Sequence, residues 1–262
     1  MTVLVNGDTL NEANETFVVN LSNASGGTIG DGQGQGTITN DDPLPAIAVG
    51  DVSVPEFDYN TGTVTVYVTL SAPSGRTVSV FYETANGTAS STSANKDYID
   101  TFGTLTFAPG QTVQSFLISI VGDTRVEPDE TIRVLLSSPV NASIADDLAI
   151  VTITNDDFAY VTITGASVTE GNSGQTPAVV TVSISNAADY NIFFDYTTAD
   201  GSATAGSDYV AAAGTLTFVA GETSHTITLQ VNGDLIDELD EDFEVSLSTT
   251  SPNVIQIGRA HV

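Results

Sequence analysis

The chain carries one acidic motif three times, and the residues of this motif are its strongest candidates for chemistry. The motif is an Asp, a Glu four residues later and a second Glu three residues after that, followed by an alternating apolar run. It begins at Asp8, recurs 115 residues later at Asp123, and recurs again 111 residues later at Asp234. Carboxylate oxygens are the ligands that hard cations such as Ca²⁺ prefer. The motif therefore predicts a cation site in each copy.

Other landmarks recur with nearly the same period. Asn40-Asp41-Asp42 returns as Asn155-Asp156-Asp157, and the Gly-Thr-Leu-Thr-Phe segment at 103–107 returns at 214–218. A period of this length corresponds to a whole domain and not to one turn of a solenoid. We therefore predict the C-terminal part of one repeat (1–45), a complete repeat (46–158), a third repeat that lacks its last strand (159–256), and a sequence artefact (257–262).

The composition excludes several classes of partner. The 262 residues include 33 Asp and Glu but only five Lys and Arg, which gives a formal net charge of −28. Nucleic acids and anionic lipid surfaces both require basic patches, so neither is expected as a partner. The chain has no Cys and two His, so thiolate and other soft-metal sites are poorly supplied. No apolar run is long enough for a spanning helix, so we expect no membrane insertion within these residues.

The segments between the acidic motifs alternate polar and apolar residues with a period of two. One example is the segment at 64–69, where the apolar residues Val64, Val66 and Val68 alternate with residues that carry a hydroxyl, such as Thr65 and Thr69. This alternation is typical of half-buried strands, and the Gly, Asn, Asp and Pro clusters between them mark turns. We expect strands near 47–54, 63–71, 77–85, 102–107, 112–121, 131–137 and 148–154. The predicted fold class is all-β, with tandem immunoglobulin-like antiparallel β-sandwiches of about seven strands each.

Taken together, these motifs resemble the Calx-beta domain family, which occurs in sodium–calcium exchangers and in large bacterial surface proteins. The resemblance rests on a Glu after the first strand, the run at 198–209, the Gly-Thr-Leu-Thr-Phe segments, the acidic motif and the closing Asn-Asp-Asp. It covers nearly the whole chain. It implies a calcium site at one tip of each sandwich, formed by the early Glu, the Asp of an Asp-Gly turn, the acidic loop and the final Asp run.

The family positions can be assigned residue by residue. The middle repeat has Asn86 where the family turn has Asp, and an amide oxygen can ligate but brings no charge. The first repeat has lost its early Glu, and the third lacks the closing Asp pair. The resulting metal ligands are Glu56, Asn86, Asp123, Glu127, Glu130, Asp156 and Asp157 in the middle repeat, Glu170, Asp200, Asp234, Glu238 and Glu241 in the third, and Asp8, Glu12, Asp41 and Asp42 in the first.

We interpret the chain as a calcium-binding structural segment of a large extracellular or cell-surface, adhesin-like protein. Its expected partners are calcium ions, the neighbouring repeats, and a protein or glycan surface ligand. Two other functions stay open, namely a calcium-sensing regulatory module of a membrane protein and a ligand- or glycan-binding accessory module. The acidic loops could also be solvated surface without an ion. No enzyme is expected, because neither His has a counterpart in another repeat and the acidic loops lack the apolar walls that raise a catalytic pKa.

Overall fold

The computed structural model describes residues 1–256 and 260–262, and every regular element in that part of the chain is a β-strand. This confirms the all-β fold class. The residues that are described contain no helix with the length and apolar character that a membrane crossing requires. Residues 257–259 of the expected artefact lie outside the described residues, whereas Ala260–His261 form strand β20.

The first repeat is a single hairpin. Strands β1 (Glu15–Asn20) and β2 (Gln33–Ile38) pair antiparallel, from Glu15 opposite Ile38 to Asn20 opposite Gln33. A two-stranded hairpin has no second sheet to cover its apolar side chains. Val18 and Leu21 are accordingly more than half exposed.

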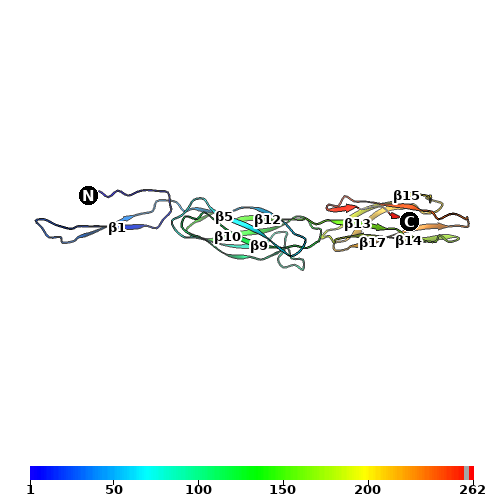
Figure 1. The fold of residues 1–262 in the computed structure, drawn as a ribbon, viewed down its shortest axis with the longest axis horizontal. Helices are drawn as coiled ribbons and strands as arrows, with labels where there is room; N and C mark the ends of the chain where they lie inside the picture. The colour runs from blue at the N-terminus through cyan, green and yellow to red at the C-terminus, as the bar shows by residue number, and fades with distance from the viewer. Residues whose placement is uncertain (257–259) are drawn as a thin grey trace. The chain divides into compact units, whose positions relative to one another are not determined.

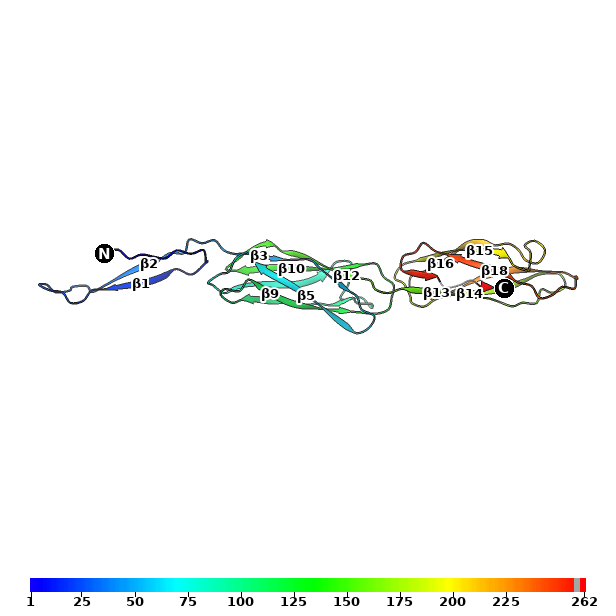
Figure 2. The same cartoon turned by 45° about the horizontal axis from the view of Figure 1, so that its top comes forward.

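The middle repeat consists of two five-stranded sheets, whose strands can be followed in Figure 2. Their inward-facing side chains alternate with exposed ones, as the sequence pattern predicts, and Val66, Val80, Ile118 and Val134 are completely buried. One sheet has the order β4 (Val52–Pro55), β12 (Leu148–Thr154), β10 (Glu130–Val140), β6 (Val78–Asn86) and β8 (Phe102–Phe107). The other has the order β11 (Ser143–Asp146), β3 (Ala46–Val49), β5 (Thr61–Leu70), β9 (Val113–Val121) and β7 (Tyr98–Ile99).

Three features of this sandwich differ from the sequence prediction. The expected strand at 47–54 is two strands, because the chain leaves one sheet after β3 and joins the other as β4. The change of sheet occurs at Gly50 and Asp51, where the Asp51 carboxylate accepts a hydrogen bond of 2.8 Å from the Ile150 amide of β12. The short strands β7 and β11 were not expected, and β11 pairs parallel with β3 in an otherwise antiparallel sheet.

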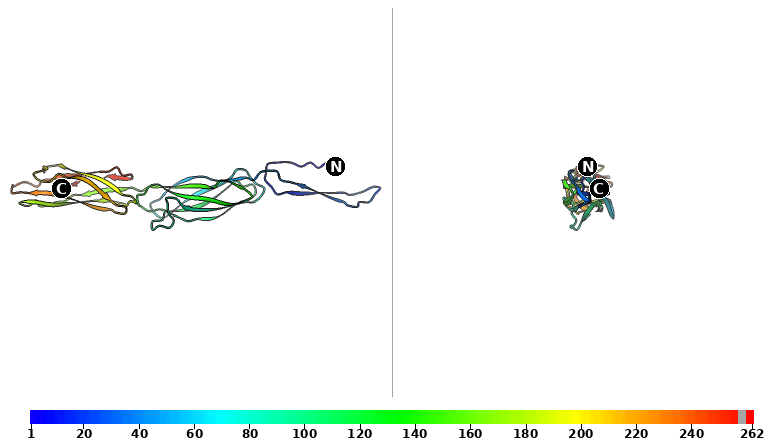
Figure 3. Two further views of the ribbon diagram at one scale, coloured as in Figure 1. Left: turned by 180° about the vertical axis from the view of Figure 1, so that it is seen from behind. Right: turned by 90° about the vertical axis from the view of Figure 1, so that its left-hand side faces the viewer.

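The third repeat has two four-stranded sheets, with some of their strands labelled in Figure 1 and seen from behind in Figure 3. Its core includes Phe194, Phe218 and Tyr209, and the Tyr209 ring stacks on Phe243 with centroids 4.0 Å apart. One sheet has the order β17 (Ser224–Gly233), β14 (Gly174–Ile184), β13 (Ala159–Thr164) and β19 (Val254–Gln256). The other has the order β16 (Ala213–Phe218), β15 (Ile192–Asp200), β18 (Phe243–Ser248) and β20 (Ala260–His261).

The chain divides into two compact units. The first unit comprises 1–54, 61–121 and 130–154, and the second comprises 55–60, 122–129 and 155–262. Each unit contains a pairing between an acidic loop and the turn of the following repeat. In the first unit Asn11 bridges to Ser74, and in the second Val126 bridges to Ala188.

The two loop pairings use the same backbone hydrogen bonds. The Gly75 amide donates to the Asn11 carbonyl at 3.0 Å, and the Asp189 amide donates to the Val126 carbonyl at 3.1 Å. Side chains add to the second pairing, where the Arg125 guanidinium donates to the Asp189 carboxylate. The acidic loops are therefore structural contacts as well as candidate metal sites.

The glycine that begins the middle acidic loop is required by close packing. A Cβ on Gly122 would overlap the Phe57 carbonyl oxygen and lie 2.8 Å from the Glu56 carbonyl oxygen. Gly233 holds the same position in the third repeat, and a Cβ on Gly233 would lie 2.8 Å from the Glu170 carbonyl oxygen. These glycines let the acidic loop pass beside the segment that carries the early Glu.

Gly122→Ala should therefore lower the free energy of unfolding by about 1–3 kcal/mol, the range of a steric change that forces the backbone to shift. Gly50→Ala is the matched control, because no atom lies within 4 Å of its added Cβ, and it should be close to neutral. Urea unfolding of both variants checks the expectation. Equal stability of the two variants would contradict it.

Candidate metal sites

All three acidic loops begin with the same local turn. The first Asp of each motif accepts a hydrogen bond on Oδ1 from the amide two residues later, a turn that Asp favours for its short side chain. The bonds run from Leu10 to Asp8 (2.8 Å), from Arg125 to Asp123 (2.7 Å) and from Ile236 to Asp234 (2.6 Å). The first Asp thus shapes the loop that carries the following glutamates.

The middle repeat brings three carboxylates together where two adjacent strands end. Glu56 follows β4, and Asp156 and Asp157 follow β12, its neighbour in the sheet. One carboxylate oxygen from each residue lies within 4.8 Å of the others. Glu56 and Asp157 are only 4% and 6% exposed, so water can offset little of their mutual repulsion.

Asp157 shows the electrostatic cost of this arrangement. Burial, followed by the charges of Asp156, Asp58 and Asp123, raises the pKa of Asp157 from 3.8 to about 6. Its Oδ2 is buried and has no hydrogen-bond partner among the described residues. Buried polar atoms nearly always have a bonding partner. An unpartnered buried carboxylate oxygen is therefore suited to binding a ligand such as a cation. A cation at this position would satisfy the oxygen and offset the repulsion, and we judge that the residues fit a hard metal ion.

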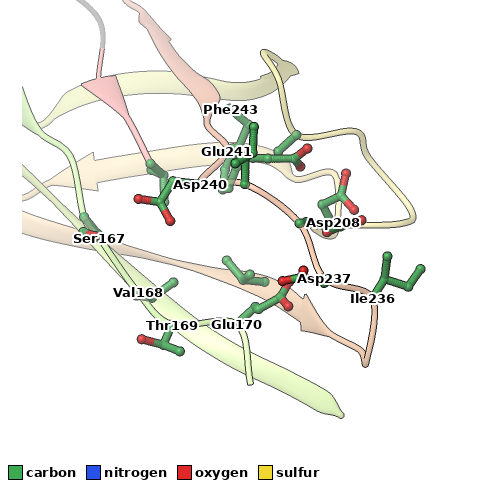
Figure 4. Close-up of a pocket in the computed structure, with 16 residues that line it drawn as sticks. Ser167, Val168, Thr169, Glu170, Asp208, Ile236, Asp237, Asp240, Glu241 and Phe243 are labelled. Carbon is green, nitrogen blue, oxygen red and sulfur yellow. The ribbon is translucent and has the colours of Figure 1, made fainter. Parts of the chain in front are cut away.

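The third repeat has a second carboxylate cluster of different composition. Asp208, Glu238 and Glu241 each place a carboxylate oxygen within 4.8 Å of the others. Burial and the neighbouring charges of Asp234 and Asp208 raise the pKa of Glu238, and burial and Asp208 raise that of Glu241. The cluster borders a pocket of about 560 Å³. Figure 4 shows Glu170, Asp208 and Glu241 around this pocket, contributed by three different segments.

The remaining predicted residues of the middle repeat have varied surroundings. Glu127 is buried and its carboxylate lies 3.9 Å from the Arg125 guanidinium. Glu130 is half-buried at the start of β10. Asn86 already uses its Oδ1 to accept hydrogen bonds from the Tyr98 hydroxyl (2.6 Å) and the Ser91 amide (3.1 Å). That oxygen therefore supports the local loop.

Asp200 of the third repeat corresponds to Asn86 and is used in the same way. Its Oδ1 accepts hydrogen bonds from the Tyr209 hydroxyl at 2.7 Å and the Ala205 amide at 2.9 Å. The Tyr209 hydroxyl and this amide lower the pKa of Asp200. Asp200 is not among the clustered carboxylates of the described residues.

The predicted ligands of the first repeat are not brought together. Asp8, Glu12, Asp41 and Asp42 belong to none of the carboxylate groups found in the described residues. Asp8 and Asp41 are exposed, while Glu12 and Asp42 are half-buried. The hairpin contains no strand that would bring an early Glu beside them.

Sequence reasoning did not assign Asp208 or Asp58 to a site. Asp208 belongs to an Asp-Tyr pair that has a counterpart, Asp97-Tyr98, 111 residues earlier in the chain. This recurrence was the available signal, and it also places Asp97 at the equivalent position of the middle repeat. Asp58 has no such counterpart in the third repeat, where Asn172 stands at the corresponding step of 114 residues.

Comparison with known proteins agrees with the resemblance found in the sequence. The model of the Calx-beta domain matches residues 1–43, 47–163 and 156–261. Extracellular matrix protein 3 of Lytechinus variegatus is 28% identical over 261 residues, which cover 94% of this chain and 8% of that protein. The sodium/calcium exchanger Calx of Drosophila melanogaster is 31% identical over 171 residues, which cover 64% of this chain and 18% of that protein. The chain thus spans less than a fifth of either relative.

Solved structures with sequence similarity include two from Calx. The calcium binding domain CBD12 of CALX1.1 aligns over 77% of this chain and 78% of its own, with 27% identity and a TM-score of 0.38. The apo-form Calx CBD1 domain aligns over 44% of this chain and 100% of its own, with 29% identity and a TM-score of 0.39. The sandwich architecture of this chain is defined by its own strands and sheets.

The raised pKa of Asp157 predicts a pH dependence of stability in the absence of calcium. The Asp157 carboxyl binds its proton more tightly in the folded chain than in the unfolded chain. Protonation of Asp157 therefore stabilises the fold fully below pH 3.8, and this stabilisation is lost as the pH rises through about 6. Asp157→Asn mimics the protonated side chain. The variant should therefore gain about 1–3 kcal/mol relative to wild type between about pH 4 and 7, since one pKa unit corresponds to about 1.4 kcal/mol.

Urea unfolding in EDTA at several pH values measures this difference. Asp42→Asn, at the same position of the first repeat, is the matched control and should show a much smaller dependence, because Asp42 belongs to no carboxylate cluster of the described residues. A pH-independent difference between wild type and Asp157→Asn would contradict the prediction.

Proposed function

From the premise that the chain belongs to the Calx-beta domain family, we propose that it is a calcium-binding structural segment of a larger extracellular or cell-surface protein. The single observation that carries the proposal is the buried Asp157 carboxylate, which has an unpartnered oxygen beside Glu56 and Asp156. Ca²⁺ accepts six to eight oxygen ligands in flexible geometry, whereas Mg²⁺ requires a tighter octahedron. Calcium therefore suits carboxylates that come from loops and strand ends.

We propose a set of calcium ligands for the middle repeat. In the middle repeat Glu56, Asp156 and Asp157 form the centre of the site, with Asp123 close enough to affect the pKa of Asp157. Glu127 and Glu130, with Asp97, hold the same repeat positions as the clustered Glu238, Glu241 and Asp208 of the third repeat, and we propose them as further ligands. When bound, calcium supplies positive charge that offsets the repulsion among these carboxylates.

The proposed structural role follows from the second use of the acidic loops. Within each compact unit, an acidic loop pairs with the turn of the following repeat. An ion that orders the loop would also order this pairing, so calcium would stiffen the segment. We propose that the functional repeats divide at 1–45, 46–158 and 159–256. The name of the matrix relative and its 94% coverage of this chain support a matrix or cell-surface setting.

A calcium-sensing module of a membrane protein is the second candidate. It is favoured by the 31% identity to the sodium/calcium exchanger Calx over 64% of this chain. Both candidates require calcium binding, and neither requires catalysis. The two candidates differ in what they require of the rest of the protein. A sensor must transmit calcium binding to an attached transporter, whereas a structural segment needs only to stay rigid when calcium is bound.

Calorimetric titration of the full chain tests calcium binding directly. Extracellular modules bind calcium with dissociation constants of about 10⁻⁴ to 10⁻³ M. Calcium at 100 times the dissociation constant should stabilise the folded state by about 2.7 kcal/mol per independent site. The melting temperature should therefore rise in millimolar calcium by more than in NaCl or MgCl₂ of equal ionic strength.

The double variant Glu56→Gln with Asp157→Asn should lose the middle-repeat component of the titration. The matched control is Glu83→Gln with Asp147→Asn, which makes the same change of charge at two exposed positions and should titrate like wild type. An absence of saturable binding up to ~10 mM, beyond the range of extracellular modules, would sink the calcium proposal.

A further inference from the structure

The asparagine that precedes the two clustered aspartates uses every polar group of its side chain. Asn155 Oδ1 accepts a hydrogen bond of 3.0 Å from the Glu127 amide, and Asn155 Nδ2 donates to the Asp157 carbonyl at 2.9 Å. The Asn155 amide donates to Asp129 Oδ1 at 3.1 Å. These three hydrogen bonds, which we call the Asn155 latch, join the acidic loop to the strand end that carries Asp156 and Asp157.

The first repeat contains the same latch, formed by different residues. Asn40 Oδ1 accepts from the Glu12 amide at 2.8 Å, and Asn40 Nδ2 donates to the Asp42 carbonyl at 3.0 Å. The Asn40 amide donates to Asn14 Oδ1 at 2.9 Å. Two copies with all three bonds in common indicate that the arrangement is a feature of the repeat.

The chemistry of the latch requires an asparagine. Its side chain must accept at one atom and donate at the other, and an aspartate at position 155 could not donate to the Asp157 carbonyl. Both ends of the Asn155 amide are occupied by the backbone, so this side chain is not placed as a metal ligand. The third bond needs only an acceptor oxygen, because Asp129 and Asn14 serve equally in the two repeats.

We infer that Asn155 is a positioning residue for the proposed calcium site of the middle repeat, an inference that rests on the proposed function. The latch fixes the Glu127 amide of the acidic loop against Asp157, and so it sets how the loop lies relative to the strand-end aspartates before any ion binds. A metal site holds its ion tightly only when the residues behind the ligands fix their positions. Asn40 makes the equivalent hydrogen bonds in the first repeat, where the candidate ligands belong to no carboxylate cluster of the described residues.

Calcium titration of latch variants in the full chain tests this role. Asn155→Ala should raise the calcium dissociation constant of the middle-repeat component by about 10-fold or more, the usual effect of losing a group that orients a ligand. That component is the one removed by Glu56→Gln with Asp157→Asn. Asn40→Ala deletes the same side chain from the latch of the first repeat and is the matched control, which should leave the middle-repeat dissociation constant unchanged.

The acceptor position supplies a conservative variant. Asp129→Ala removes the acceptor for the Asn155 amide and should weaken calcium binding, whereas Asp129→Asn keeps an acceptor oxygen, as Asn14 does, and should bind within about 2-fold of wild type. Equal weakening by the Ala and Asn variants would mean that charge and not the hydrogen bond matters, and it would overturn the inference. An Asn155→Ala chain that loses stability with an unchanged dissociation constant would also overturn it.

Hydrogen exchange of the Glu127 amide in EDTA separates the latch from the metal. Wild type should protect this amide without calcium, and Asn155→Ala should lose the protection. If wild type binds no calcium, the proposed function and the positioning role for calcium both fail, while the exchange result still shows whether Asn155 holds the loop. If the Glu127 amide is equally protected in Asn155→Ala, the latch itself is refuted, whatever the titration shows.

Discussion

The sheet ends of the middle repeat force like charges together, and the rest of the tip is arranged around this constraint. Adjacent strands β4 and β12 end beside each other, so Glu56 and the Asp156–Asp157 pair cannot separate without breaking the sheet. Burial then makes the repulsion stronger than it would be in water, and the pKa of Asp157 rises to about 6. The apolar core stabilises an arrangement that its charged tip opposes, and a cation is the simplest way to remove the opposition.

The acidic loop is held in place by hydrogen bonds whose donors are neutral backbone amides. Its first Asp folds the loop through an amide hydrogen bond, and Asn155 joins the loop to the strand end. The backbone amides that donate these hydrogen bonds add no charge, whereas the Asp123 carboxylate that accepts one of them contributes to the raised pKa of Asp157. One cation of the chain, Arg125, lies near Glu127 but directs its guanidinium toward Asp189 of the next repeat. The tip is therefore ordered mainly by hydrogen bonds and remains rich in negative charge.

Much of the fold could be predicted from the sequence, because period-two alternation reports directly which side chains face a core. Val64, Val66 and Val68 illustrate this, and all three are buried. The change of sheet at Gly50 was not predicted, although the phase of the alternation shifts there: the buried positions change from Ile47 and Val49 to Val54. The hydrogen bond from the Ile150 amide to Asp51, which joins positions far apart in the sequence, could not be foreseen from the pattern. The clustering of Asp208 was missed although its Asp-Tyr pair recurs, because the recurrence marks an equivalent position but does not show which carboxylates lie near it. Conversely, Asn86 fits the expected position, but its oxygen is engaged by Tyr98, a partnership that spacing alone does not show.

The pairings between successive repeats consist first of backbone hydrogen bonds, from Gly75 to Asn11 and from Asp189 to Val126. Backbone groups are the same at every position, so this part of the pairing survives almost any change of side chain. Duplication of a gene segment encoding one whole repeat would place an equivalent loop beside an equivalent turn, and the new junction would form without prior adaptation. Side-chain pairs such as Arg125 with Asp189 can then be added one at a time, which gives each junction its own identity after the repeat has been copied. An array built in this way can lengthen first and diversify later.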